Sequence, residues 1–180
     1  MNMWKSKFLI ISFIFFVSRV FANEELYNSV TKIDVLNTTF DTVNVFEGDD
    51  TQFLILINSY CCHDCFKQLE KSILEQKKSE YKIKIISRCP NDIVTIKKNL
   101  VDLKRLFNCK EFYFDLHQEQ DAIPPTNSKE GFFGYFKVVQ TPALIVFSKQ
   151  KHKLDFYSYR DLFANDKKLN MNVGKILKGL

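Results

Sequence analysis

The sequence predicts one α/β domain, a mixed sheet with helices on both faces. First, the apolar run Phe53–Asn58 leads into a C-x-x-C motif, Cys62-His63-Asp64-Cys65, and an amphipathic helical pattern follows at once. Second, the apolar patterns alternate between strand and helix spacing, βαβαβ, before a β-hairpin and a final helix. Third, the 180 residues include 18 Phe but only 5 Gly, which suits a sizeable core and not a disordered chain.

The N-terminus has the pattern of a signal peptide. Two lysines precede the apolar run Phe8–Val17, and a small-residue cleavage site ends at Ala22. About ten apolar residues are too few to span a bilayer core of ~30 Å. We therefore expect a signal peptide at 1–22 and a single domain at 23–180, exported and periplasmic if the host is a Gram-negative bacterium. The alternative is that the same segment stays attached as an uncleaved anchor.

The net charge gives no sign of nucleic-acid binding. The chain carries a formal charge of +5, but three of its basic residues lie in the expected signal peptide. The remainder has 23 basic and 21 acidic residues, since 26 less 3 is 23, and its balance is +2. A balance this close to neutrality predicts no nucleic-acid partner.

The first half of the expected domain reads as a hairpin, a strand and a helix. Residues 32–36 and 42–46 are short strands around a turn at Asn37. The continuous apolar run at 53–58 is typical of a strand covered on both faces. The next helix has one apolar face, made by Phe66, Leu69, Ile73 and Leu74.

The middle of the chain continues with a strand, a long helix and a strand. The strands are expected at 81–87 and 111–116. Asn91 or Asp92 can cap the helix between them. Its apolar stripe is Ile93, Ile96, Leu100, Leu103 and Phe107.

A polar surface loop is expected at 117–131, followed by a short turn or helix at 131–136. Residues 143–148 and 153–159 then form a hairpin. Asp166 is expected to cap a last helix that buries Leu169, Val173, Ile176 and Leu177.

The position of the C-x-x-C motif gives it chemical meaning. A thiol between a strand and a helix lies over the unpaired N–H groups and the positive dipole end of that helix. Both stabilise a thiolate, which is the form that attacks disulfides and binds metals. With two residues between them, Cys62 and Cys65 can close a small ring and reopen it at little cost in chain entropy.

A second feature is Thr141-Pro142, directly before the apolar strand that starts at Ala143. Proline is suited to the start of a strand because it has no N–H to donate to the ladder. The Thr141–Pro142 bond can be cis or trans, and the residues alone leave both open.

The two features together resemble the thioredoxin fold, and the exported TlpA/ResA-like branch in particular. The 80 residues from Cys62 to Pro142 leave room for the inserted βα unit of that branch. The resemblance implies a thiol–disulfide oxidoreductase of reductase-like direction. It assigns Cys62 as nucleophile, Cys65 as buried resolving cysteine in a Cys62–Cys65 disulfide, and Pro142 as a cis-proline. The backbone at Thr141 would pair with the substrate.

Three positions depart from the family pattern. Cys61 occupies the place usually held by Trp before the first cysteine. Gln68 and Glu70 stand where the family often has Glu and Pro. Leu56 replaces the buried acid found six residues before the first cysteine in thioredoxins, so no internal base for Cys65 is evident.

His63 and Asp64, between the two cysteines, should act in opposite directions. A protonated His63 stabilises a thiolate, which favours the reduced form. The Asp64 carboxylate disfavours a thiolate. His63 can also be read as an ordinary exposed turn residue.

The expected partners are protein disulfides or dithiols and a membrane or periplasmic redox partner, with the protein itself a monomer. No cofactor and no metal are expected on this interpretation.

Two other classes of function stay open. Cys61 and Cys65 form a C-x-x-x-C that resembles the copper site of Sco-type chaperones, and soft thiolates select Cu(I). That site needs a distal histidine, for which His152 and His117 are the candidates. A non-catalytic interaction module with a structural disulfide is the third alternative.

The other thiols are expected to be less reactive. Cys61 should remain a thiol packed under the active-site loop. Cys89 and Cys109 bracket the long helix, about 27 Å in length, so they cannot pair within one molecule. Cys89 reads as a small buried hydrophobe, or as a third thiol at the edge of the sheet that carries the C-x-x-C, and Cys109 as structural or an unpaired surface thiol.

Overall fold

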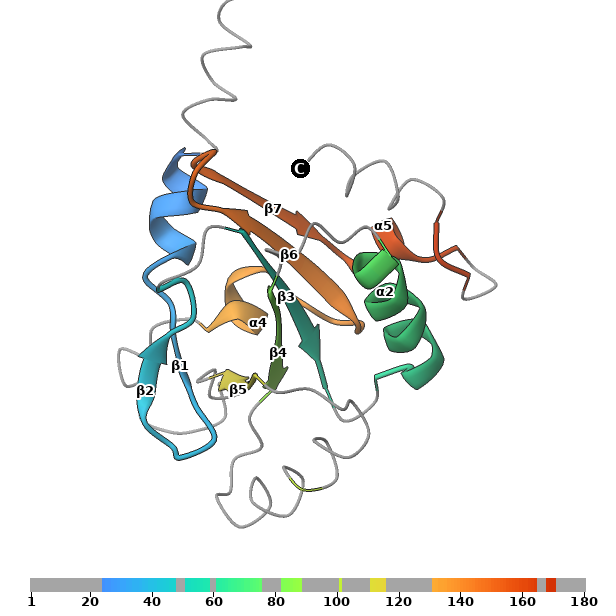
Figure 1. The fold of residues 1–180 in the computed structure, drawn as a ribbon, viewed down its shortest axis with the longest axis horizontal. Coiled ribbons are helices and arrows are strands. Elements are labelled where there is room, and N and C mark those ends of the chain that lie inside the picture. The colour runs from blue at the N-terminus through green and yellow to red at the C-terminus, as the bar shows by residue number, and fades with distance from the viewer. Residues whose placement is uncertain are drawn as a thin grey trace, which may run out of the picture.

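The computed structural model describes residues 24–47, 51–58, 61–75, 82–88, 101, 111–115, 131–164 and 168–170. Within them a seven-stranded sheet has the order β2-β1-β5-β4-β3-β6-β7 (Figure 1). The strands are β1 (Asp34–Leu36), β2 (Thr42–Asn44), β3 (Thr51–Ile57), β4 (Lys82–Arg88), β5 (Phe112–Asp115), β6 (Ala143–Ser148) and β7 (Lys153–Tyr157). The helices are α2 (His63–Glu75), α4 (Phe132–Tyr135), α5 (Tyr159–Leu162) and a helix over residues 24–30.

The sheet is mixed, as the sequence predicts. Strand β3 pairs in parallel with β4, and β4 with β5. On its other side β3 pairs antiparallel with β6, which forms a hairpin with β7. The N-terminal hairpin of β1 and β2 joins the sheet through β5. The predicted fold class, a mixed sheet with helices on both faces, is therefore confirmed.

The two faces of the sheet bury two separate apolar cores. Alternate residues of a strand point to opposite faces, so Ile55 and Ile57 of β3 pack with α2 and α5. Leu54 and Leu56 pack on the other face, with α4 and the helix over residues 24–30. This explains why β3 is continuously apolar.

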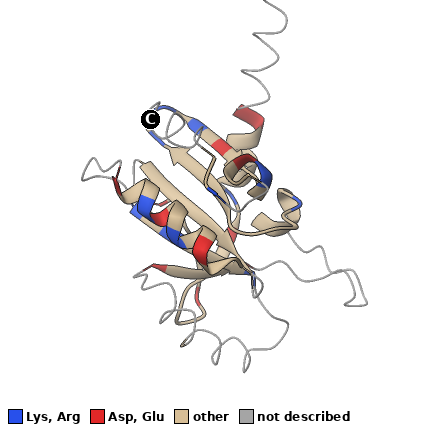
Figure 2. Cartoon of the chain, turned by 90° about the vertical axis from the view of Figure 1, so that its right-hand side faces the viewer, with Lys and Arg blue, Asp and Glu red and all other residues tan. Residues whose placement is uncertain are grey.

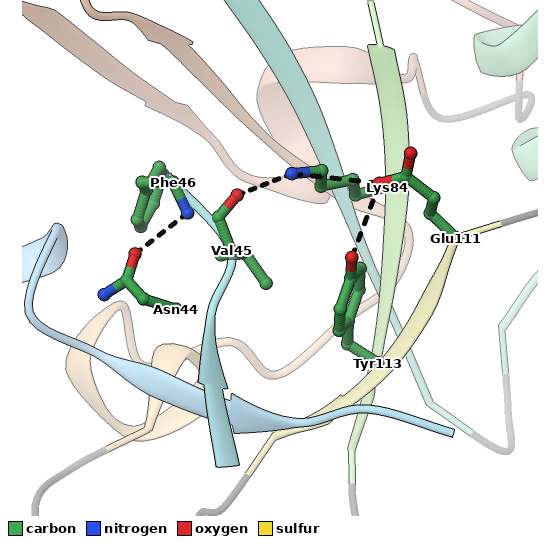
Figure 3. A network of polar contacts seen from close by, with 6 residues as sticks. All are labelled: Asn44, Val45, Phe46, Lys84, Glu111 and Tyr113. Carbon is green, nitrogen blue, oxygen red and sulfur yellow. Dashed lines mark hydrogen bonds and ion pairs between the residues drawn. The ribbon is translucent and has the colours of Figure 1, made fainter. Parts of the chain in front are cut away.

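A buried lysine fixes the N-terminal hairpin to the central strands (Figure 3). The Lys84 ammonium donates to the Val45 carbonyl over 2.7 Å and lies 3.8 Å from a carboxylate oxygen of Glu111. The same carboxylate accepts from the Tyr113 hydroxyl at 3.4 Å. The network joins the turn after β2 to β4 and β5, so that a charge with 4% exposure is compensated.

One segment is helical where a strand is expected. The hairpin strand predicted at 153–159 ends at Tyr157, and α5 begins at Tyr159. Ser158 and Asp161 form a capping box that starts the helix. The helix over residues 24–30 is also an element that sequence patterns did not predict.

The predicted last helix is absent at residues 168–170, while its expected cap Asp166 and the residues Val173, Ile176 and Leu177 lie outside the described residues. Leu169 forms an antiparallel bridge with Phe163 instead of lying in a helix capped by Asp166. The Asn170 N–H donates to the Leu162 carbonyl over 2.7 Å, and Ala164 N–H to the Lys168 carbonyl over 2.9 Å. Backbone groups in residues 168–170 therefore form hydrogen bonds with residues 162–164 rather than within a helix.

Several expectations lie outside the described residues. These are the signal peptide, Cys89, Cys109, His117, the loop at 117–130 and, apart from Val101, the long helix between β4 and β5. In the part of the chain that the structure describes, no helix is long and apolar enough to cross a membrane.

The short helix α4 starts on a buried carboxylate. The two oxygens of Asp115, which has no exposed surface, accept from the N–H groups of Phe132 and Phe133 at 2.9 Å each. A Cβ on Gly131 would lie 2.6 Å from the Asp115 carboxyl carbon, so glycine is required there. This contact ties the end of β5 to the segment that leads towards Pro142.

We predict that Asp115→Ala lowers the free energy of unfolding by about 2–3 kcal/mol, because two buried N–H groups lose a charged acceptor. Asp161→Ala removes the more exposed cap of α5 and should lower it by less than about 1 kcal/mol. Urea unfolding of both variants measures the difference. If both variants lose the same free energy of unfolding, the burial of the Asp115 carboxylate adds nothing to its effect and the prediction is wrong.

Candidate active site

The candidate site lies where β3 ends and α2 begins. Ile57 is the last residue of β3, and His63 is the first of α2. The Phe66 N–H donates to the Cys62 carbonyl over 2.9 Å, which is the first turn of helical hydrogen bonding. Cys62 is therefore placed at the N-terminal end of a 13-residue helix, where a thiolate is stabilised.

Cys62 and Cys65 form a disulfide with their α-carbons 5.2 Å apart. Cys62 is half-buried, whereas Cys65 has no exposed surface. The Cys65 N–H also points to the Cys62 sulfur over 3.3 Å. Of the two cysteines, Cys62 is thus the more exposed, and its sulfur receives a backbone donor.

The two residues between the cysteines form the first turn of α2. His63 is half-buried and Asp64 is exposed. Further along the helix, burial raises the pKa of Glu70, and the charges of Lys67 and His63 partly offset that effect. Positive and negative residues alternate along the outer face of α2 without forming a patch of one sign (Figure 2).

The segment before β6 lies against this junction. Leu56 of β3 pairs with Ala143 at the start of β6. The Thr141 hydroxyl donates to the Asn58 side-chain oxygen over 2.8 Å, and the Thr141–Pro142 peptide bond is cis. Thr141 and Pro142 are both buried, so the register of β3 and β6 holds them beside the end of β3.

Cys61 is a free thiol in this structure. Burial raises the pKa of the Cys61 thiol to about 11, and interaction with the Thr141 hydroxyl offsets only part of that rise. Its N–H donates to the Asn58 carbonyl over 3.0 Å, which places it inside the turn. A thiol in this environment stays protonated at neutral pH and is a poor nucleophile.

Tyr159 is a site residue that sequence reasoning missed. Its hydroxyl lies 3.5 Å from the Cys65 sulfur. Leu56, at the family's acid position, packs on the opposite face of the sheet from Cys65. The sequence signal that could have revealed Tyr159 is the capping box Ser158-x-x-Asp161, which predicts a helix start at this position.

Within the residues that the structure describes, the copper site suggested by Cys61 and Cys65 is not assembled, and His117 lies outside them. His152 lies in the turn between β6 and β7, at the end of β6 opposite to Pro142, and its ring stacks on Tyr27 at 3.9 Å. Among the described residues, no group of three His, Cys, Asp or Glu side chains is placed to hold a metal ion.

A groove of about 370 Å³ lies beside the site. One wall is the segment that leads to the cis-proline, and the other is the end of β7 with the start of α5. Its lining includes Phe136, Lys137, Val139, Phe156, Tyr159 and Arg160. Val139 is 85% exposed, so an apolar side chain projects at the rim.

Comparison with solved structures identifies the fold. The chain matches a thioredoxin-like protein from Aeropyrum pernix with a TM-score of 0.55 and 8% identity, over 87% of this chain and 94% of that one. It matches MTB DsbF with a TM-score of 0.52 and 9% identity, over 84% and 96%. A secreted Mycobacterium tuberculosis disulfide oxidoreductase homologous to E. coli DsbE matches with a TM-score of 0.51 and 9% identity, over 85% and 98%. The fold is therefore thioredoxin-like.

No protein-family model matches the sequence, and no curated protein resembles it significantly.

We predict a specific pH dependence for Cys61. Because the unfolded thiol ionises near 9 and the folded thiol near 11, the unfolded chain releases this proton first as pH rises. The stabilisation from the neutral thiol is thus complete below pH 9 and is lost as pH rises to about 11. Peptide-resolved alkylation of the folded protein should show Cys61 reacting slowly at pH 8 and fully only near pH 11. Fast modification at pH 8 would contradict the buried environment.

Proposed function

We propose that this protein is a thiol–disulfide oxidoreductase that exchanges disulfides with protein substrates through Cys62 and Cys65. The observation that carries the proposal is a disulfide between the half-buried Cys62 and the fully buried Cys65 at the N-terminus of α2, where Thr141 contacts Asn58 at the end of β3. The thioredoxin-like fold supports it, because two of the matched structures are described as disulfide oxidoreductases or carry a Dsb name.

In the reductive direction the Cys62 thiolate attacks one sulfur of a substrate disulfide. A bond forms between Cys62 and that sulfur, the substrate S–S bond breaks, and the departing substrate thiolate takes up a proton. The Cys65 thiolate then attacks the Cys62 sulfur. This forms the Cys62–Cys65 disulfide and releases the second substrate thiol. Two electrons pass from the protein to the substrate, and the reverse sequence donates a disulfide.

The resemblance to the TlpA/ResA-like branch favours the reductive direction. Export with signal peptide 1–22 and a single domain over 23–180 belong to the same proposal. They are supported by the pattern of the N-terminal sequence. The partners would be exported proteins with disulfides and a membrane or periplasmic protein that recycles the Cys62–Cys65 pair.

We predict that Cys62→Ser abolishes exchange with a disulfide substrate, because no other accessible thiolate remains at the end of α2. Cys65→Ser should instead accumulate mixed disulfides, since nothing then attacks the Cys62 sulfur. Insulin reduction and non-reducing gels measure the two effects, with Cys61→Ser as the adjacent control that keeps activity. If Cys62→Ser keeps exchange activity while Cys61→Ser loses it, the nucleophile is assigned wrongly.

We also propose that the groove beside Tyr159 holds the polypeptide around the substrate cysteine. It combines an exposed apolar rim at Val139 with two cations, Lys137 and Arg160. The nearby acids Asp155 and Asp161 are engaged, the first with Lys153 at 2.8 Å and the second in the capping box. The groove therefore favours an apolar segment that carries an acidic side chain.

We predict that Lys137→Glu combined with Arg160→Glu lowers kcat/KM for a disulfide peptide with an acidic flank by about threefold to tenfold. Reduction of a small neutral disulfide should not change. Lys149→Glu with Lys151→Glu makes the same change in net charge at the far end of β6 and serves as the control. If the control variant loses as much kcat/KM, the effect comes from the net charge of the protein and not from the groove.

A further inference from the structure

Three features hold Tyr159 beside Cys65: the capping box at the start of α5, the stacking of its ring on Phe163, and its packing against the core. Tyr159 is the first residue of this helix, and Ser158 and Asp161 fix the helix start through a capping box. Its ring stacks on Phe163 with centroids 5.0 Å apart. The ring packs against the same core as Cys65, and the hydroxyl lies 3.5 Å from the sulfur.

Apolar side chains from other elements pack in the core around Cys65. Ile55 and Ile57 of β3 and Leu144 of β6 belong to the core that contains Cys65. The titratable groups of its own segment are Cys61, Cys62, His63 and Asp64, and Tyr159 is the titratable group that α5 brings into contact with the sulfur. A thiolate in such a place is strongly disfavoured unless a donor reaches it.

We propose that Tyr159 is a positioning residue whose hydroxyl donates a hydrogen bond to the Cys65 thiolate. The proposal rests on the proposed function and assigns a role within it. When Cys65–SH loses its proton to solvent, the O–H of Tyr159 stabilises the charge, so a larger fraction of Cys65 is ready to attack the Cys62 sulfur. The Tyr159 proton stays on its oxygen throughout, and the electron pair of Cys65 forms the new S–S bond.

The same contact raises the tendency of the disulfide to accept electrons. A hydrogen bond to a thiolate is stronger than one to a neutral disulfide sulfur. Tyr159 therefore stabilises the reduced form more than the oxidised form, and the reduction potential rises. The Tyr159 hydroxyl thus acts as a hydrogen-bond donor to Cys65 and does not replace the base that is missing at Leu56.

The test is Tyr159→Phe, which removes one oxygen and keeps the ring that stacks on Phe163. We expect the equilibrium with glutathione to shift about tenfold towards the disulfide, which corresponds to a potential about 30 mV more negative. Peptide-resolved alkylation of reduced Cys65 should shift to higher pH. The mixed disulfide at Cys62 should be resolved more slowly.

Tyr157→Phe is the matched control, because it deletes a hydroxyl from the same edge of the sheet. This hydroxyl interacts with Asp155, and the potential should not change. If Tyr159→Phe unfolds at the same urea concentration as the unmodified protein and its potential and alkylation profile are unchanged, the proposal is wrong. Should Tyr159→Phe fail to fold, Tyr159→Gln supplies a different donor. If Tyr159→Gln lowers the reduction potential as much as we expect for Tyr159→Phe, only the packing of the ring matters and the proposal is wrong.

These readouts also separate the proposal from the function on which it rests. The potential and the alkylation of Cys65 are measured on the protein with small thiols alone. If the protein reduces no polypeptide disulfide, the proposed function fails while the effect of Tyr159 can still be observed. If exchange activity is normal and Tyr159→Phe changes neither readout, only the role of Tyr159 fails.

Discussion

The antiparallel register between β3 and β6 is the constraint on which the site depends. Leu56 opposite Ala143 aligns the end of β3 with the start of β6. As a consequence, the turn that carries the cysteines meets the turn that carries Thr141 and Pro142. A slip of one residue would exchange the two faces of β3 and put its core residues on the wrong sides. Because both faces of β3 are buried, that slip is strongly disfavoured, and the packing of the two cores therefore holds the chemistry in place.

The same burial explains how much of the fold the sequence predicts. A strand covered on both faces must be continuously apolar, and β3 and β6 stand out for that reason. The junction of a strand, a C-x-x-C and a helix is also recognisable from the sequence, because the N-terminus of a helix stabilises a thiolate. The fold class, seven strand positions and the place of Cys62 and Cys65 at the start of α2 all follow from such local patterns.

What the sequence concealed depends on contacts between distant segments. Tyr159 reads as the end of an alternating strand, and only its approach to Cys65, 94 residues earlier, gives it a role. Leu169 has helical spacing with later residues, but its segment pairs with Leu162 and Phe163 instead. The position of Leu56 relative to Cys65 also required the structure, since counting back along the chain does not tell which face of β3 a residue occupies.

Three sulfurs within five residues differ in chemistry because they differ in surroundings. Cys61 is enclosed in the turn without a compensating donor of sufficient strength, and burial holds its proton. Cys62 is half-buried and receives the Cys65 N–H at the helix terminus. Cys65 is more deeply buried than either, yet it has a hydroxyl within reach. The degree of burial alone therefore does not predict which of these thiols ionises most readily. The donor that each sulfur meets decides which can become a thiolate, and the donor at Cys65 comes from α5, an element outside the motif.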